Sequence, residues 1–351
     1  MKLLIEASAL IPLYEGILEE RSLGGTETAI VRISNELVKL GIDVTVRTSH
    51  SDHSGDKVRY LSQRQNLDFG QFDVCVVVQN WRIIPLLPKM KIVFWTGDGP
   101  EQYSNLGVGD LRLQNQIKKM VVTTQYHKKS LCEQSGFPVS KTEVIGNGVA
   151  DFFIAEKSEN RQGLIYHSAP YRGLEHLLRY FDDIKKTGSK LELNIFSDME
   201  LYNRSDKYVG PYSEILPRLK AKYSTFPGIR FSKTIPQKDL AKELKKSAIF
   251  PYPCIVPEVF CMSMLEAMAA GVVPLVSDIG GLAEVLGDAD LVVSGVAGEK
   301  SFDREFCKRL VSLSTDDEMR NEKSELLRDR AKNHFKWSNL AKNFKILLEE
   351  L

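Results

Sequence analysis

The sequence lacks the features that mark a secreted, membrane-spanning or metal-binding protein. Its five cysteines are odd in number and none forms a CxxC pair, so we expect reduced thiols in a cytosolic protein. No cluster of histidines and cysteines has the spacing of metal ligands, and no metal or other cofactor is expected. The N-terminus runs into a short apolar segment without the features of a signal peptide. No apolar run approaches the roughly 20 residues that a membrane span needs, and we expect a cytoplasmic location.

An excess of charge of either sign is also absent. The 47 lysines and arginines nearly balance the 46 aspartates and glutamates, which gives a formal net charge of +1. A nucleic-acid-binding surface usually shows as a basic excess or a basic stripe, and since the sequence has neither, nucleic acid is not an expected partner. The length of 351 residues exceeds one ordinary core. It suits two domains of roughly 150 residues each.

What the chain does have is a regular alternation of apolar strands and amphipathic helices. A helix is expected over Thr26–Leu40, where apolar residues recur near the helical period and Gly41 follows the last turn. Nearly all-apolar runs are typical of parallel strands covered on both faces. The strands expected in the first half are Lys2–Ala7, Val44–Arg47, Val74–Val78, Ile92–Trp95 and Met120–Thr124. This alternation predicts a doubly wound α/β sheet.

Turn residues and charges interrupt the pattern from Ile145 to Gln162, and a second alternating series follows. Its expected strands are Gly163–His167, Leu191–Phe196, Ile229–Phe231, Ala248–Pro251, Val273–Ser277 and Leu291–Val293. The expected helices include Gly173–Lys186, Gln237–Ser247, Met262–Ala270 and Trp337–Leu351. We therefore expect two Rossmann-like domains, residues 1–155 with the C-terminal helix 337–351, and residues 156–336. Ligands of such sheets bind outside the carboxyl ends of the strands.

Two glutamates, Glu258 and Glu266, lie around the start of an apolar helix that follows one of these strands. A helix that is apolar nearly all round is buried, and an ionised carboxylate there needs hydrogen bonds or a partner charge. The vicinal hydroxyls of a ribose would satisfy Glu266, while Glu258 can meet a second polar group of the same ligand. Free N–H groups at the helix N-terminus suit a diphosphate. The alternative is a structural glutamate paired with a lysine or arginine.

The segment from Pro257 to Gly271 resembles the E-x7-E signature of the family 4 retaining glycosyltransferases, which have the GT-B fold. Further resemblances cover nearly the whole chain. They lie in the glycine loop Leu23–Thr28, the end of the first domain at Val144–Val149, the continuation of the signature over Gly271–Val285, and the start of the last helix at Phe335–Ser338. The resemblance implies two Rossmann-like domains facing across a cleft, with the C-terminal helix crossing back to the first domain.

The resemblance also implies roles for residues of the signature. Glu266 would bind the donor ribose, Glu258 would contact hydroxyls of the transferred sugar, and the backbone amides of Phe260, Cys261 and Met262 would hold the phosphates. Cys261 stands where the family commonly has glycine, which leaves the local backbone conformation open. A reactive thiol is the alternative for Cys261, although no nearby basic residue in the sequence favours a lowered thiol pKa.

Arg172 lies between an expected strand and an expected helix, and it resembles the basic residue, usually lysine, that the family has before a glycine. A fixed cation at this point would neutralise the departing nucleoside diphosphate. A surface salt bridge is the alternative. The family's further arginine has no counterpart among Tyr166, His167 and Ser168, so a second cation is missing or comes from elsewhere.

Other donor contacts are expected from both halves of the chain. Gly24 and Gly25 precede the first long helix and allow a close backbone approach to a phosphate, with a plain tight turn as the alternative. Asp98 stands near the position of a family histidine that contacts the transferred sugar, with a turn-forming aspartate as the alternative. Tyr252 and the loop Phe231–Thr234 are expected at the nucleotide base.

Together these features predict a retaining, metal-independent glycosyltransferase that moves a sugar from a UDP- or GDP-sugar to a glycan, a lipid-linked acceptor or another hydroxyl. The alternatives are a GT-B sugar phosphorylase, a nucleotide-sugar epimerase and a non-catalytic nucleotide-sugar-binding module. Lysine pairs such as Lys118–Lys119 and Lys128–Lys129 are interpreted as solvated helix faces, or as peripheral contacts to anionic lipid head groups at the inner membrane face. The sequence indicates no oligomeric state.

Overall fold

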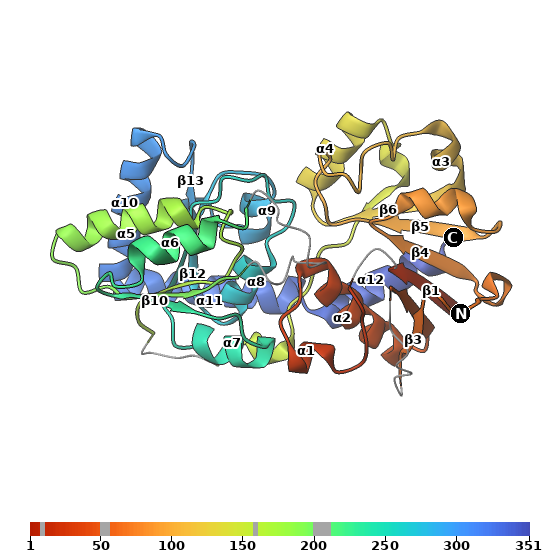
Figure 1. Ribbon diagram of the computed structural model, residues 1–351, viewed down its shortest axis with the longest axis horizontal. Coiled ribbons are helices and arrows are strands. Elements are labelled where there is room, and N and C mark those ends of the chain that lie inside the picture. The colour runs from red at the N-terminus through yellow and green to blue at the C-terminus, as the bar shows by residue number, and fades with distance from the viewer. Residues whose placement is uncertain (8–10, 50–56, 157–160, 199–211) are drawn as a thin grey trace. The chain divides into compact units, whose positions relative to one another are not determined.

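The apolar segments form two separate parallel sheets in the computed structural model of the protein (Figure 1). The structure describes residues 1–7, 11–49, 57–156, 161–198 and 212–351. Unit 1 contains Met1–Ile17, Leu23–Gly148 and Phe335–Leu351, and unit 2 contains Leu18–Ser22 and Val149–His334. The stretch Val149–Ala155 belongs to unit 2 because the Ala155 N–H donates to the carbonyl of Ala269 at 3.0 Å.

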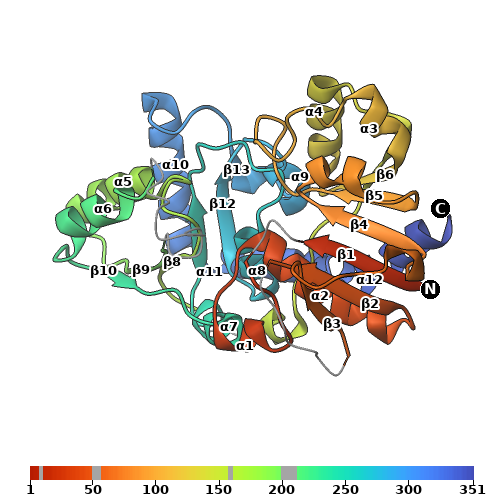
Figure 2. The ribbon, with the colours of Figure 1, turned by 45° about the vertical axis from the view of Figure 1, so that its right-hand side comes forward.

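Within the described residues, the sheet of unit 1 has seven parallel strands in the order β3-β2-β1-β4-β5-β6-β7. Figure 2 labels β1 to β6 of this sheet. The strands are β1 (Lys2–Ala7), β2 (Asp43–Thr48), β3 (Arg59–Ser62), β4 (Val74–Val78), β5 (Lys91–Trp95), β6 (Ile117–Val122) and β7 (Thr142–Val144). The helices of this unit are α2 (Gly25–Lys39), η1 (Phe69–Gln71), η2 (Trp81–Leu86), α3 (Leu111–Gln116), α4 (Gln125–Ser135), η3 (Val139–Lys141) and α12 (Trp337–Glu349). The short helix α1 (Ile17–Glu20) begins at the last residue of the first segment of unit 1, and its other residues belong to unit 2. The β4 side chains are all buried, as expected of a central strand covered on both faces.

Unit 2 holds a sheet of six parallel strands, counted over the residues that the structure describes, in the order β10-β9-β8-β11-β12-β13. The strands are β8 (Leu164–Tyr166), β9 (Leu193–Phe196), β10 (Ile229–Ser232), β11 (Ile249–Tyr252), β12 (Val273–Ser277) and β13 (Val292–Val293). The helices are η4 (Asp151–Phe153), α5 (Leu174–Lys186), α6 (Ile215–Tyr223), α7 (Gln237–Leu244), α8 (Met262–Ala269), α9 (Leu282–Leu286), η6 (Ala289–Leu291), α10 (Lys300–Thr315) and α11 (Asp317–His334). Both sheets are therefore doubly wound, and this part of the predicted fold is confirmed.

The differences from the expected elements have local causes. Thr124 was expected in a strand, but its hydroxyl accepts a hydrogen bond from the His127 N–H at 3.0 Å and caps α4 instead. Gly163 lies outside β8 because its φ of +70° is left-handed. Strands β3 and β7 were not expected, since each is a short edge strand interrupted by polar residues. Helices α10 and α11 were not expected either.

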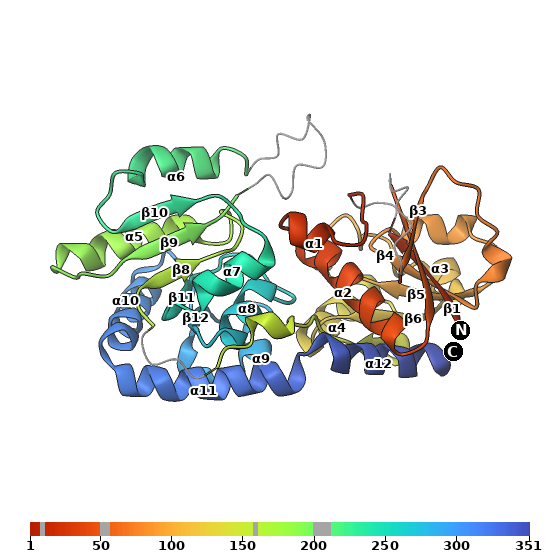
Figure 3. The same cartoon turned by 90° about the horizontal axis from the view of Figure 1, so that it is seen from below.

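The C-terminal helix α12 packs against α2 in unit 1, as predicted (Figure 3). The rings of Trp95 and Phe344 lie edge to face with their centroids 5.5 Å apart, and Lys345 Nζ donates to the Leu40 carbonyl at 3.1 Å. The backbone at Gly148 lies against the first residue of this helix, and a Cβ there would lie 2.6 Å from the Trp337 ring. A glycine is therefore required at this position. The end of the chain thus completes the core of unit 1.

The strand orders define one topological switch point in each sheet. In unit 1 the order reverses between β1 and β4, and in unit 2 it reverses between β8 and β11. Loops that leave neighbouring strands in opposite directions open a crevice at this point, and ligands of open α/β sheets bind there. In unit 2 the loops concerned are residues 167–173, after β8, and residues 253–261, after β11.

Gln79, at the carboxyl end of β4, was not singled out from the sequence. Among the described residues it is the one non-glycine residue with a positive φ, at +58°, and the Asn80 N–H donates to the Val78 carbonyl at 2.7 Å across it. Its buried amide donates to Thr26 Oγ1 at 3.1 Å. Gln79 is therefore a strained residue that supports the start of α2, at the switch point of unit 1.

Gln79 offers a test of this strain. Gln79→Val places a β-branched residue in a left-handed conformation and also removes the hydrogen bond to Thr26. We therefore expect the free energy of unfolding to fall by about 2–3 kcal/mol. Gln79→Gly also removes that hydrogen bond but relieves the backbone strain, because glycine adopts a positive φ readily. We expect its free energy of unfolding to stay within about 1 kcal/mol of that of the natural protein. Thermal melts of the two variants should therefore differ by several degrees. Equal melting temperatures would contradict a strained Gln79.

Candidate functional site

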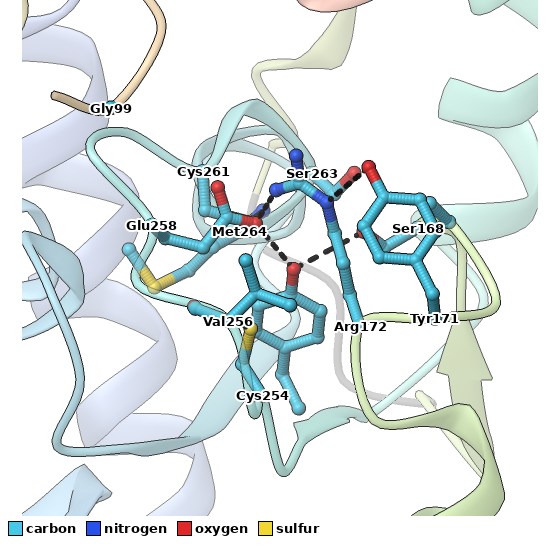
Figure 4. Close-up of polar contacts among 12 residues, drawn as sticks. Gly99, Ser168, Tyr171, Arg172, Cys254, Val256, Glu258, Cys261, Ser263 and Met264 are labelled. Carbon is cyan, nitrogen blue, oxygen red and sulfur yellow. Dashed lines mark hydrogen bonds and ion pairs between the residues drawn. The ribbon is translucent and has the colours of Figure 1, made fainter. Parts of the chain in front are cut away.

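The loops at the switch point of unit 2 bring Glu258 and Arg172 together. The two side chains point toward each other and form an ion pair between Glu258 Oε1 and Arg172 Nη1 (Figure 4). The side chain of Glu258 is 5% exposed and that of Arg172 is 25% exposed. The sequence left open a surface salt bridge for Arg172; instead, its partner is a buried carboxylate, and the guanidinium remains partly accessible.

Tyr252 provides the second contact to Glu258. Its hydroxyl lies 2.6 Å from Glu258 Oε1, to which it donates, and 3.2 Å from Ser168 Oγ. Burial raises the pKa of Tyr252 well above its usual value, so the phenol keeps its proton. Tyr252 is fully buried. In the structure Tyr252 holds the carboxylate of Glu258, and its contact with the nucleotide base stays a prediction.

Two glycines force the loops into this arrangement. Gly173 has a φ of +96°, and a Cβ there would lie 2.0 Å from the Pro253 carbonyl oxygen. Gly280 has a φ of +66°, and a Cβ there would lie 2.2 Å from the Glu258 carbonyl oxygen. The next N–H, of Gly281, donates to that same oxygen at 2.6 Å. The backbones on either side of the ion pair are therefore fixed by contacts that only glycine permits.

Tyr171 lies beside the ion pair and gives Arg172 a further contact. Arg172 Nε donates to the Tyr171 hydroxyl at 3.4 Å, and the guanidinium carbon lies 5.5 Å from the centre of the Tyr171 ring (Figure 4). Tyr171 itself stacks on Tyr212, with ring centroids 4.5 Å apart. The sequence pattern included Tyr171 in the loop but gave no signal for this aromatic support.

Glu266 lies on the buried helix α8, as predicted. It is 7% exposed, and its Oε1 accepts a hydrogen bond from Gln237 Nε2 at 3.0 Å. His167 Nε2 lies 3.7 Å from Glu266 Oε2. Both contacts come from other elements, since Gln237 is the first residue of α7 and His167 follows β8. The sequence gave no indication of these two partners, because they become neighbours of Glu266 only when the sheet forms.

The turn between the two glutamates leads into α8. Phe260 and Cys261 are buried, and Met262 is the first residue of the helix. Cys261 is its N-cap, with φ −98°, and the Met264 N–H donates to Cys261 Sγ at 3.4 Å. The cysteine that replaces the family's glycine is thus accommodated in ordinary extended backbone. Whether the amides of Phe260, Cys261 and Met262 hold phosphates stays a prediction.

Cys261 is not expected to react as a nucleophile. Burial raises the pKa of its thiol to about 11, so the thiolate is a very small fraction at neutral pH. We expect iodoacetamide to leave Cys261 unmodified in the folded protein at pH 7, whereas all five cysteines should react in guanidinium chloride. Mass-spectrometric mapping of the alkylated peptides measures this. Rapid labelling of folded Cys261 at pH 7 would revive the reactive-thiol alternative.

The candidate residues of unit 1 gather at its own switch point. Gly24 is the N-cap of α2 and Gly25 its first residue. A Cβ at Gly97 would lie 3.9 Å from Thr26 Oγ1, so the loop after β5 reaches the start of α2. Asp98 Oδ2 accepts from Ser104 Oγ at 2.6 Å. Asp98 is therefore built into a turn, which was the alternative interpretation, and its role toward a sugar stays a prediction.

A metal centre is not evident at either switch point. Within the described parts of the chain, no three His, Cys, Asp or Glu side chains are grouped so that they could hold a metal ion. The charged chemistry of the site in unit 2 comes from Arg172, Glu258 and Glu266. These three groups suit a ligand that carries both hydroxyls and an anion, since carboxylates accept hydrogen bonds from hydroxyls and a guanidinium pairs with phosphate oxygens.

Comparison with solved structures defines the class of the fold. A glycosyltransferase from Rickettsia africae is 14% identical, with a TM-score of 0.75 over 99% of this chain and 98% of its own. Sucrose-phosphate synthase from Thermosynechococcus elongatus is 13% identical, with a TM-score of 0.77 and the same coverage. Anabaena Alr3699/HepE, solved in complex with UDP-glucose, is 15% identical, with a TM-score of 0.74 over all of both chains. These similarities show the GT-B fold.

The family is shown by the sequence itself. Residues 150–333, more than half of the chain, match the model of the family described as Glycosyl transferases group 1. A search of curated protein sequences finds no match. The chain belongs to the Glycosyl transferases group 1 family and is a glycosyltransferase, which confirms the resemblance that its motifs carry.

Proposed function

We propose that the protein transfers a hexose from a UDP- or GDP-sugar to a hydroxyl of a glycan or lipid-linked acceptor, with retention at the anomeric carbon and without a metal ion. The observation that carries the proposal is the ion pair between the buried Glu258 and the partly exposed Arg172 at the switch point of unit 2, in the loops that precede α5 and α8. Tyr252 supports this pair through its bond to Glu258. Arg172 is the partly accessible cation that the leaving diphosphate requires, because its guanidinium can pair with phosphate oxygens while Glu258 orients it.

Each side chain then has one task in the transfer. Arg172 and the amides of Phe260, Cys261 and Met262 stabilise the diphosphate as the bond from the anomeric carbon to the phosphate oxygen breaks. Glu258 orients the sugar hydroxyls, and Glu266 accepts hydrogen bonds from the ribose. The acceptor oxygen forms the new bond on the same face, and its proton passes to the departing phosphate oxygen. Catalysis rests on positioning and on stabilising the leaving group.

The proposed donor class draws support from one of the related structures. Anabaena Alr3699/HepE was solved with UDP and with UDP-glucose. The proposed determinant of uridine or guanosine is Phe231–Thr234, at the end of β10 and before α7, whose first residue Gln237 contacts Glu266. A thermal-shift panel of UDP, GDP, ADP and their sugars tests the donor, because a ligand that binds only the folded protein raises its melting temperature. No shift with any nucleoside diphosphate would contradict the proposal.

Two alternative activities are separated by their products. A sugar phosphorylase would release a sugar phosphate from the glycan when inorganic phosphate is supplied, and an epimerase would convert the donor without any acceptor. Slow hydrolysis of the donor, together with transfer to an added acceptor, supports the transferase. Binding of the donor without hydrolysis or transfer to any acceptor tested would favour a non-catalytic binding module.

A surface of unit 1 fits the proposed contact with a lipid surface. Tyr103 and Leu106 are 73% and 51% exposed, and Arg82 donates to the carbonyls of both. Leu86 is 83% exposed, at the end of the same short helix as Arg82. Exposed apolar side chains around a cation suit the boundary of an anionic membrane. Within the described residues, no helix is long and apolar enough to cross a membrane.

Vesicle flotation tests this contact. Leu106→Glu should reduce binding to vesicles that contain an anionic lipid by about tenfold, because it removes an apolar contact and adds a negative charge. Ile346→Glu is the matched control, since Ile346 is 54% exposed on α12. Equal binding of the Leu106→Glu variant and the natural protein would remove this surface from the proposal.

A further inference from the structure

The two glutamates of the site have contacts of different kinds. Glu258 is paired with the guanidinium of Arg172. Glu266 instead contacts the amide of Gln237 at 3.0 Å and approaches the ring of His167 at 3.7 Å. Burial lowers the pKa of His167 to about 3, so this ring is neutral over the physiological range. These two contacts of Glu266 are therefore with uncharged groups.

The ring nitrogens of His167 lack hydrogen bonds in this arrangement. Its side chain is 2% exposed, and neither ring nitrogen has a hydrogen-bond partner. Its position is nevertheless fixed, because Ser263 Oγ in the first turn of α8 donates to the His167 carbonyl at 2.8 Å and the Phe250 ring centroid lies 4.9 Å from that of His167. Leaving a buried ring nitrogen without a partner is unfavourable, so the arrangement is suited to a state in which that bond forms.

The geometry points to a small adjustment. His167 Nε2 and Glu266 Oε2 are 3.7 Å apart, whereas a hydrogen bond to a carboxylate spans about 2.7–2.9 Å. A shift of about 1 Å, within reach of a side-chain rotation, closes the gap. The neutral ring then carries its proton on Nε2 and donates to Oε2, while Gln237 donates to Oε1. Each carboxylate oxygen has two lone pairs, so it can accept from a hydroxyl as well as from its protein donor.

We propose that His167, with Gln237, is a positioning residue that orients Glu266 to accept the two hydroxyls of the donor ribose. With Gln237 on one oxygen and His167 on the other, the carboxylate of Glu266 keeps one orientation, so it distinguishes a ribose from a sugar ring that lacks a hydroxyl. His167 itself does not touch the ligand. The inference rests on the proposed function, since it requires a nucleotide donor in unit 2.

The test compares UDP with 2′-deoxy-UDP by calorimetry or thermal shift. The natural protein should bind UDP at least about tenfold more tightly, the value of one hydrogen bond to a charged group. In His167→Phe the ratio should fall below about threefold through weaker binding of UDP, with the affinity for 2′-deoxy-UDP nearly unchanged. His167→Gln, whose amide can also donate, should restore part of the ratio. His176 is a half-buried histidine of α5, and His176→Phe should leave the ratio of the two affinities unchanged.

The outcomes separate this inference from the proposed function. If His167→Phe weakens both nucleotides equally, the histidine is a packing residue and the inference is wrong, while the donor site stands. If Glu266→Gln abolishes the discrimination but His167→Phe does not, the same conclusion follows. Should His167→Phe fail to fold, Gln237→Leu tests the opposite side of the carboxylate with the same two ligands. A natural protein that binds neither UDP nor GDP overturns the proposed function, and this inference with it.

Discussion

Replacing Arg172 by alanine is expected to lower kcat about a thousandfold, equivalent to about 4 kcal/mol of transition-state stabilisation. Arg172 is the cation that Glu258 and Tyr171 hold at the switch point, and its partly exposed guanidinium is available to a diphosphate. Arg172→Lys keeps the charge but loses the planar fork and the contact with Tyr171, so we expect an intermediate loss of about tenfold. Single-turnover rates at saturating donor measure both values.

A loss of activity in Arg172→Ala has to be separated from a loss of folding. Removing the guanidinium leaves the buried carboxylate of Glu258 without its ion pair, which should cost about 2 kcal/mol or more. The double variant Arg172→Ala/Glu258→Gln removes the charge imbalance, so it should recover the melting temperature but not the turnover. Recovery of both would show that Arg172 acts only on stability.

A matched arginine pair in the same unit provides the control. Arg218 forms two 2.7 Å bonds to Glu175, and both side chains are more than half exposed. Solvent screens such a pair, so Arg218→Ala should change neither turnover nor melting temperature appreciably. Near-normal turnover of Arg172→Ala beside an unaffected Arg218→Ala would mean that the leaving group is stabilised by other groups.

The strands and the buried helix of the site could be read from the sequence because their signals are local. Val74–Val78 is apolar over its whole length and Val273–Ser277 is apolar up to its last residue, and the observed strands have the same bounds. Met262–Ala269 is apolar apart from Glu266 and Ser263, and it forms α8. In each case, contiguous residues contain enough apolar surface to determine the element.

The partners of the site residues could not be read in this way. Arg172 and Glu258 are 86 positions apart, and Gln237 reaches Glu266 over 29 positions. These contacts depend on the pairing of β8 with β11, which the structure defines through Leu164 and Ile249. The left-handed conformation of Gln79 gave no signal either, because glutamine has no particular preference for it.

The second large effect is expected at Gly173. Its φ of +96° already disfavours a side chain, and a Cβ there would lie 2.0 Å from the Pro253 carbonyl oxygen. Gly188, beyond the end of α5, has a similar φ of +86° but no atom within 4 Å of the added Cβ. Both substitutions therefore carry the left-handed penalty of about 1–2 kcal/mol, and only Gly173→Ala adds a collision with the backbone.

The difference between the two variants measures how tightly the loops at the switch point must pack. To relieve the collision, residues 167–173 and 253–261 must separate by more than 1 Å, since ordinary contacts of a Cβ begin at 3.4 Å. We expect Gly173→Ala to lower the free energy of unfolding by on the order of 3 kcal/mol more than Gly188→Ala does, because a collision with backbone cannot be relieved by a rotamer change. The same displacement moves Arg172 away from Glu258, and a misplacement of about 1 Å costs about a hundredfold in rate. Thermal melts and turnover of the pair test this, and two equally stable and active variants would show that the loops separate without consequence for the site.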